Sequence, residues 1–346
     1  MARIIAIANQ KGGVGKTTTA VNLAASLAIA ERRTLLVDAD PQGNATSGMG
    51  IAKQAVELSL YDVMMDRMPV GDVVVEQSLL PHLHVLPATQ DLVGAELELV
   101  DKPGRETALR DALAGAHDSY DYILIDCPPS LGLLTLNVLA AAEGVIIPIQ
   151  CEYYALEGIS QLLNTVRLVQ QNFNPALALD GVLLTMYDAR LNLCRQVAED
   201  AREYFGDQVF RTPIPRNVRL AEAPSFGKPI LLYDVQSVGA RSYLAVGQEL
   251  IRRIEHPDAA EAPPAAGEPA LAPVEDASAE GAEAALTREQ VIAADRAADV
   301  VTLDDEVVTL DAIVPQEEPS REESSREAAP QDEAQEVVND SAEARP

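Results

Sequence analysis

A glycine-rich loop near the N-terminus carries the residue types that bind phosphate groups. Residues 11–18 follow an apolar run and open a stretch with helical character. Glycines let backbone N–H groups turn toward an anion, and a helix starting at the loop adds its positive dipole end. Lys16 is placed to reach the β- and γ-phosphates of a nucleotide, and the Thr17 hydroxyl to bind Mg²⁺. The predicted phosphate-binding residues are Lys11, Gly12, Gly13, Val14, Gly15, Lys16, Thr17 and Thr18.

A second lysine, Lys11, stands at the mouth of this loop and is followed by two glycines. The glycines would allow two monomers to approach face to face. Lys11 could then place its charge on the phosphates of the other monomer, as an arginine finger does. The residue types leave a second interpretation open, in which Lys11 is a local surface cation.

Acidic residues end two apolar runs that are typical of buried strands. Asp38 and Asp40 end the first run, where Pro41 breaks the strand, and Asp126 ends the second. Ligands of open α/β sheets lie at the carboxyl ends of the strands. We therefore predict that Asp40 orients an attacking water and that Asp126 holds Mg²⁺ directly or through water. Each aspartate could instead be a helix cap or a turn former.

Short apolar runs alternate with helix-like stretches up to about residue 255, which predicts a doubly wound α/β fold. The sheet should be mostly parallel with helices on both faces, because several runs are apolar without alternation. The predicted strands are Ile4–Ala8, Thr34–Asp38, His84–Leu86, Tyr122–Asp126, Val145–Ile149 and Val182–Met186. The predicted helices are Thr17–Ala30, Thr107–Ala114, Gly132–Ala142, Leu156–Gln171, Cys194–Phe205 and Ala240–Arg253.

The charge is concentrated at the C-terminal end. Of 26 Lys+Arg and 54 Asp+Glu, residues 256–346 hold 5 and 24, a balance of −19 out of −28. High charge with little to bury predicts a mostly disordered tail over residues 256–346, after a folded domain over residues 1–255 that contains the phosphate loop. Two weakly apolar segments, Leu286–Val300 and Val300–Ile313, could dock a partner or could be residual hydrophobicity in a linker.

Other compositional features narrow the class of protein. No stretch is long and apolar enough to cross a bilayer, so we expect no integral membrane association. The three cysteines lack C-x-x-C spacing, which predicts buried reduced thiols.

Together these motifs resemble the ParA/Soj chromosome- and plasmid-partitioning ATPases, within the deviant Walker A group of P-loop NTPases that includes MinD. The resemblance covers residue 2 to about residue 253. The matching segments are residues 11–18, 38–46, 126–130, 184–188 and 213–232.

The resemblance implies a cytoplasmic, nucleoid-associated, Mg²⁺-dependent ATPase that forms ADP and phosphate. It would form a homodimer around ATP and bind double-stranded DNA non-specifically, and a ParB-type centromere-binding protein would stimulate hydrolysis and release. The resemblance also assigns residue roles. Lys11, Lys16 and Asp40 would be catalytic, Asp126 would associate with Mg²⁺, Pro215 and Asn217 would contact adenine, and Arg190 and Arg219 would bind DNA.

Two rival functions belong to the same group of ATPases. A MinD-like membrane ATPase ends in a basic amphipathic helix, whereas this chain ends in acid. An ATPase that positions a protein complex stays open, as does the choice between a chromosome and a plasmid as cargo. For DNA, we expect a basic surface made by Arg211, Arg216, Arg219 and Lys228, which Arg241, Arg252 and Arg253 could join.

Overall fold

The computed structural model describes residues 1–152, 157–257, 302–303 and 306–307. The chain divides into the units Met1–Glu268 and Pro269–Pro346. In the second unit, β8 (Thr302–Leu303) pairs antiparallel with β9 (Glu306–Val307). The predicted segment Leu286–Val300 lies outside the described residues, and so does most of Val300–Ile313. The boundary at residue 255 and the disorder of the tail stay predictions.

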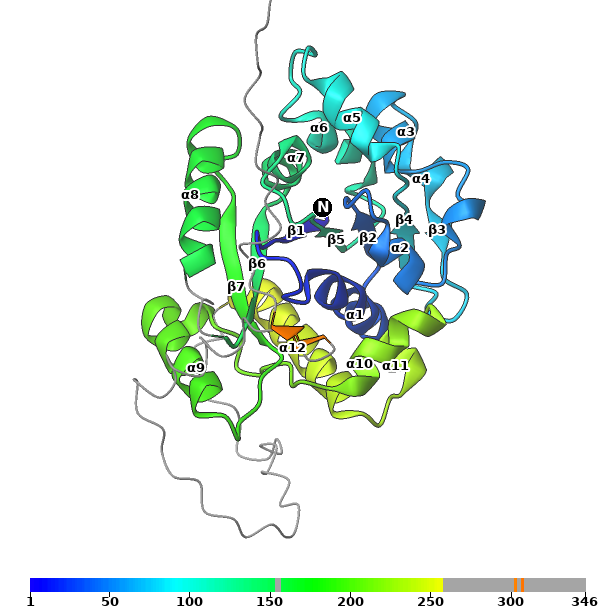
Figure 1. Cartoon of the computed structure of the whole chain (residues 1–346). Coiled ribbons are helices and arrows are strands. Elements are labelled where there is room, and N and C mark those ends of the chain that lie inside the picture. The colour runs from blue at the N-terminus through cyan, green and yellow to red at the C-terminus, as the bar shows by residue number, and fades with distance from the viewer. Residues whose placement is uncertain (153–156, 258–301, 304–305, 308–346) are drawn as a thin grey trace, which may run out of the picture. The chain divides into compact units, whose positions relative to one another are not determined.

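The first unit is built on a seven-stranded sheet in the order β3-β4-β2-β5-β1-β6-β7 (Figure 1). Every neighbouring pair is parallel except β3 with β4, which is antiparallel at the edge. The strands are β1 (Arg3–Ile7), β2 (Thr34–Asp38), β3 (Val75–Glu76), β4 (Leu83–Leu86), β5 (Tyr122–Asp126), β6 (Gly144–Gln150) and β7 (Ala178–Thr185).

Helices cover both faces of the sheet, and short 3-10 turns join the elements. One face is covered by α1 (Lys16–Ile29), α2 (Asn44–Gly48), α10 (Val218–Glu222), α11 (Ile230–Tyr233) and α12 (Val238–Glu255). The other is covered by α3 (Leu60–Met65), α4 (Val70–Val73), α5 (Leu92–Leu99), α6 (Ala108–Leu113), α7 (Leu133–Ala141), α8 (Glu157–Asn172) and α9 (Asn192–Phe205). The predicted doubly wound, mostly parallel α/β fold is confirmed.

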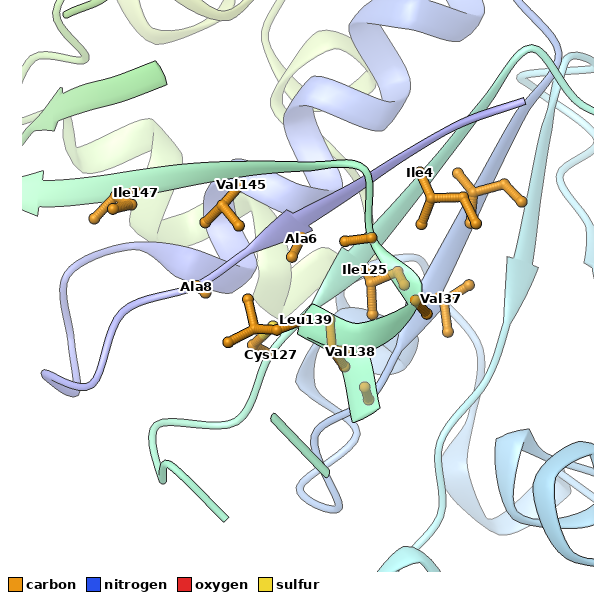
Figure 2. Close-up of a cluster of buried hydrophobic side chains, with 14 of the residues drawn as sticks. Ile4, Ala6, Ala8, Val37, Ile125, Cys127, Val138, Leu139, Val145 and Ile147 are labelled. Carbon is orange, nitrogen blue, oxygen red and sulfur yellow. The ribbon is translucent and has the colours of Figure 1, made fainter. Parts of the chain in front are cut away.

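The core follows from the two-residue period of the strands. In β1, Ile4 and Ala6 face the layer that contains α7, and Ile5 and Ile7 face the layer that contains α1. Figure 2 shows the first of these layers, where the side chains of β1, β2, β5 and β6 meet Val138 and Leu139 of α7. Because both faces are buried, the middle residues of the central strands are apolar on both faces, and the acids of β2 and β5 stand only at the strand ends.

Helix α1 packs closely against α12 (Figure 1). The Thr19 hydroxyl lies 3.2 Å from the Tyr243 hydroxyl, and both residues are buried. One turn further along α12, a Cβ added to Gly247 would lie 2.9 Å from the Ser26 Cβ. This glycine is therefore required by the close approach of the two helices.

We expect Gly247→Val to destabilise the folded unit by about 1–3 kcal/mol, because the added side chain would push α12 away from Ser26. Chemical denaturation measures the change. Gln248→Val is the matched control, since Gln248 is exposed on the same helix. Equal stability of the Gly247 and Gln248 variants would contradict the close packing described for these helices.

Candidate active site

The register of three central strands brings the predicted site residues together. Asp38 at the end of β2 is aligned with Asp126 at the end of β5, and Ile7 at the end of β1 is aligned with Asp126 on its other side. The glycine-rich loop follows β1 directly. Residues far apart in the sequence therefore meet at the carboxyl edge of the sheet, as parallel pairing requires.

The loop has the backbone conformation that its glycines predict. Gly13 and Gly15 have φ of 75° and 86°, in the left-handed region that side chains disfavour. Gly15 is the N-cap of α1, so the first turn of that helix opens into the loop. The Thr185 hydroxyl, at the end of β7, donates to the carbonyl of buried Val14 at 2.9 Å. Sequence reasoning did not predict this role of Thr185.

Lys16 lies at the centre of the arrangement and is buried. Its Nζ donates to the Lys11 carbonyl at 3.2 Å. Burial lowers the pKa of Lys16, and this shift is opposed by the nearby Asp126, Cys127 and Asp40. Burial removes water from the Lys16 ammonium, and the nearby acids favour its charged form. A buried ammonium at a glycine-rich loop is suited to bind a polyanionic ligand.

Asp126 is the most unusual group of the site. It is completely buried, and neither of its carboxylate oxygens has a hydrogen-bond partner among the described residues. Burial raises its pKa well above the ordinary range and the neighbouring Asp38 adds to this, whereas the Thr17 hydroxyl, which is close by but outside hydrogen-bond geometry, and Lys16 oppose it. Two orphaned oxygens near a hydroxyl fit a hard cation such as Mg²⁺, which prefers oxygen ligands and keeps only one or two from the protein.

Asp38 has a different environment. One of its oxygens accepts from both the backbone N–H and the hydroxyl of Thr46, each at 2.7 Å, and the other accepts from the Asp40 N–H at 3.2 Å. Burial raises the pKa of Asp38 to about 6, against the effect of these hydrogen bonds. Asp38 thus organises the loop after β2, which agrees with its interpretation as a turn-forming residue.

Asp40 is buried at the start of the same loop. Its Oδ1 accepts from the Gln42 N–H at 2.9 Å, a local turn contact. Asp40 follows the end of β2 at the same edge of the sheet, and it therefore affects the pKa of both Lys16 and Asp126. The structure therefore places the predicted water-orienting acid beside the phosphate loop, while one of its oxygens also shapes the turn.

Lys11 lies at the rim of the site and is paired within its own chain. Its Nζ is 3.3 Å from Oε2 of Glu152, which follows the end of β6. Its backbone N–H donates to the Asn9 side chain at 2.9 Å, and the Asn9 amide donates to the Pro148 carbonyl at 2.7 Å. Neither the Glu152 nor the Asn9 contact was predicted from the sequence, since no local pattern marks them.

The predicted adenine residues lie at the same edge of the sheet. Pro215 pairs with Tyr187, two residues beyond Thr185, and the Tyr187 N–H donates to the Ile214 carbonyl at 3.0 Å. The Asn217 side-chain oxygen caps α10 by accepting from the Arg219 N–H at 2.8 Å. This contact uses only the side-chain oxygen, so the Asn217 NH₂ group can still donate to a base. Recognition of adenine by Asn217 stays a prediction.

The predicted DNA-binding arginines are exposed and paired with acids. Arg190 contacts Asp188 at 2.8 Å and lowers the pKa of that carboxyl to about 2. Arg219 contacts Glu222 at 3.0 Å and Asp234 at 3.5 Å. Arg211, Arg216 and Lys228 are also exposed.

The expectation that Arg253 joins this basic surface is wrong. Its guanidinium stacks on the Phe210 ring, 4.5 Å from the centroid, and pairs with buried Glu249 at 2.5 Å. It also donates to the carbonyls of Asp180, Gln208 and Val209. The arginine joins α12 to the edge of the sheet, a role that residue type does not reveal.

Two further expectations concern the described part of the chain. The three cysteines are free and buried, as predicted. Among the described residues, no helix is long and apolar enough to cross a membrane.

Comparison with known proteins gives consistent matches. A family model described as an AAA domain matches residues 2–179. The chain is 61% identical over 251 residues to the chromosome partitioning protein ParA of Myxococcus xanthus, covering 72% of this chain and 88% of the relative. It is 60% identical over 250 residues to the sporulation initiation inhibitor protein Soj of Bacillus subtilis, covering 72% of this chain and 98% of the relative.

A solved structure is similar over the same region. It is a Mycobacterium smegmatis protein described as cobyrinic acid a,c-diamide synthase, crystallised with ADP and magnesium. The TM-score is 0.66 at 40% identity, over 74% of this chain and 97% of that one.

Proposed function

Because this chain belongs to the ParA/Soj family of partitioning ATPases, we propose that it dimerises around ATP, binds DNA non-specifically as that dimer, and is released when a ParB-type partner stimulates hydrolysis. The observation that carries the proposal is the meeting of Lys16, Asp40 and the orphaned Asp126 at one edge of the sheet. A phosphate loop alone would bind a nucleotide, whereas the two acids add the means to hydrolyse it.

In this proposal the chain mainly positions and stabilises charge, as phosphoryl transfer requires. The N–H groups of the loop and the Lys16 ammonium bind the β- and γ-phosphates. Asp40 orients the attacking water through the oxygen that is not bonded to Gln42. The Lys11 side chain breaks its contact with Glu152 and places its charge on the phosphates of the second monomer. Pro215 and Asn217 contact the adenine.

Thr17 and Asp126 would hold Mg²⁺, because the Asp126 oxygens have no other partner among the described residues. The ion would neutralise charge on the phosphate oxygens. The Mycobacterium smegmatis structure with bound ADP and magnesium supports the binding of Mg²⁺ together with a nucleotide.

The proposed DNA surface includes Arg190 and Arg219. Both are paired with carboxylates in the isolated chain, so DNA phosphates must compete with Asp188, Glu222 and Asp234. This competition would keep the affinity of a monomer low, and a dimer would present each arginine twice. Non-specific binding of this kind needs only phosphate contacts.

Binding of the chain to an arbitrary DNA duplex, with and without Mg²⁺-ATP across a salt series, tests the proposal. We expect ATP-dependent binding, and we expect Arg219→Gln to reduce the slope of log affinity against log salt by up to about 2, since each phosphate contact accounts for about 0.9 and a dimer has two. Dimerisation with ATP should be unchanged, because Arg219 lies outside the proposed nucleotide site.

Arg110→Gln is the matched control for this variant, because Arg110 is also exposed and paired, with Asp111. A wild-type chain that binds DNA equally well without ATP would contradict the proposed cycle. An Arg219 variant with the same slope as the Arg110 variant would place the DNA surface elsewhere.

A further inference from the structure

The pairing of Lys11 within its own chain bears on how dimerisation is controlled. Lys11 Nζ contacts Oε2 of Glu152 at 3.3 Å, with 40% and 47% of the two side chains exposed. A lysine engaged in this way cannot also reach the phosphates of a second monomer. Dimerisation of the proposed kind therefore requires that the contact with Glu152 be broken in each chain.

The Glu152 carboxylate is itself held in place. Its other oxygen, Oε1, accepts from the Gln150 side-chain amide, and its backbone N–H donates to the Gln150 carbonyl at 2.8 Å. Gln150 is the last residue of β6, so the carboxylate is fixed relative to the sheet. The Lys11 backbone is held beside the same strand, because its N–H donates to the Asn9 side chain, whose amide donates to the Pro148 carbonyl of β6.

We infer that Glu152 is a positioning residue that retains Lys11 on its own chain and thereby opposes ATP-dependent dimerisation. The inference rests on the proposed function, in which Lys11 serves the second monomer. An exposed ion pair changes an equilibrium by a factor of about 1.4 to 5. Two such pairs are broken per dimer, so Glu152 would weaken dimerisation by about two- to thirtyfold.

The test is Glu152→Gln, which removes the charge but keeps an amide oxygen for the Gln150 contact. Sedimentation velocity with Mg²⁺ and a non-hydrolysable ATP analogue gives the dimer dissociation constant. We expect it to fall by about two- to thirtyfold at low salt. The gap should close toward 1 M salt, where the Debye length is about 3 Å. Glu199→Gln, on the exposed face of α9, is the matched control.

A second measurement reports on Lys11 directly in the nucleotide-free monomer. Acetylation of lysines by acetic anhydride, followed by mass spectrometry, should be faster at Lys11 in Glu152→Gln than in the wild type. Lys102, which is exposed and makes no ion pair with a described residue, is the internal reference. A structural defect would change both lysines, whereas removal of the ion pair changes Lys11 alone.

The outcomes separate this inference from the proposed function. A wild-type chain that stays monomeric with the ATP analogue would overturn the proposed function, and this inference with it. A wild type that dimerises, combined with a Glu152→Gln variant that dimerises equally or more weakly, would overturn only the role of Glu152. Unchanged labelling of Lys11 in that variant would do the same.

Discussion

Replacing Asp126 by asparagine should cut Mg²⁺-dependent ATP hydrolysis at least about a hundredfold while making the nucleotide-free chain more stable at neutral pH. The loss of activity follows from removing the charged oxygens proposed to hold the ion. The gain in stability follows because Asp126 is fully buried with no hydrogen-bond partner among the described residues. An amide in its place has no charge to bury.

The pH dependence gives the sign of this effect. Burial raises the pKa of Asp126 in the folded chain, so folding takes up a proton where the unfolded chain has released it. The free energy of unfolding of the wild type therefore falls as the pH rises from the ordinary carboxyl range through the raised pKa, by up to about 1.4 kcal/mol per pH unit. Asp126→Asn loses the Asp126 contribution to this decrease and keeps that of Asp38, whose pKa is also raised, so the stability difference should widen as the pH rises.

Urea denaturation at a series of pH values without nucleotide measures the difference, and phosphate release measures activity. Asp121→Asn is the control of opposite sign. Asp121 precedes the same strand, and its hydrogen bond with Arg33 lowers its pKa, so that variant should lose stability and keep activity. An Asp126→Asn chain that hydrolyses ATP normally, or that is less stable than wild type at pH 8, would refute the interpretation of this carboxylate.

Asp40→Ala should reduce hydrolysis by about 100- to 10,000-fold and leave a dimer that persists in Mg²⁺-ATP. The alanine removes the acid proposed to orient water, while Lys16, Thr17 and Asp126 stay in place to bind the nucleotide. The hydrogen bond that Asp40 accepts from the Gln42 N–H belongs to a local turn, so the fold should survive its removal.

Gel filtration with Mg²⁺-ATP, followed by phosphate release over hours, compares the wild type with Asp40→Ala. Asp66→Ala, at an exposed position, controls for the removal of an acid as such. Normal hydrolysis by Asp40→Ala would exclude its role with water. Failure of this variant to dimerise would show that Asp40 is needed to assemble the site.

The central strands were predictable because they are apolar on both faces and end in recognisable residues. Thr34–Asp38 and Tyr122–Asp126 were predicted with the bounds that the structure has. The two-residue edge strand β3 and the short helices were missed, because such short elements show no periodicity. For α3 a signal existed, since Ser59 and Asp62 form a capping box.

The start of β7 shows a different limit. The apolar run predicts a strand from Val182, but β7 begins at Ala178, where its residues are partly exposed. A register shift in β6, between Val145 and Ile146, accompanies this pairing. Such a shift depends on the neighbouring strand and leaves no mark in the local sequence.

The candidate site also has a part that the sequence predicts and a part that it does not. The phosphate loop is contiguous, so its residues and the glycine conformations follow from the pattern. The contacts of Thr185 with Val14 and of Glu152 with Lys11 join residues more than 140 positions apart. They depend on which strands are neighbours, which becomes visible only when the sheet is assembled.

The burial of α1 has a consequence for the thermodynamics of nucleotide binding. The helix is enclosed from Thr19 to Ala28, and the loop before it is tied to Thr185. The N–H groups that would surround the phosphates are therefore ordered when the chain folds. Little conformational entropy is left to lose when ATP arrives, so the ordering cost of binding should fall on residues outside this helix, such as Lys11.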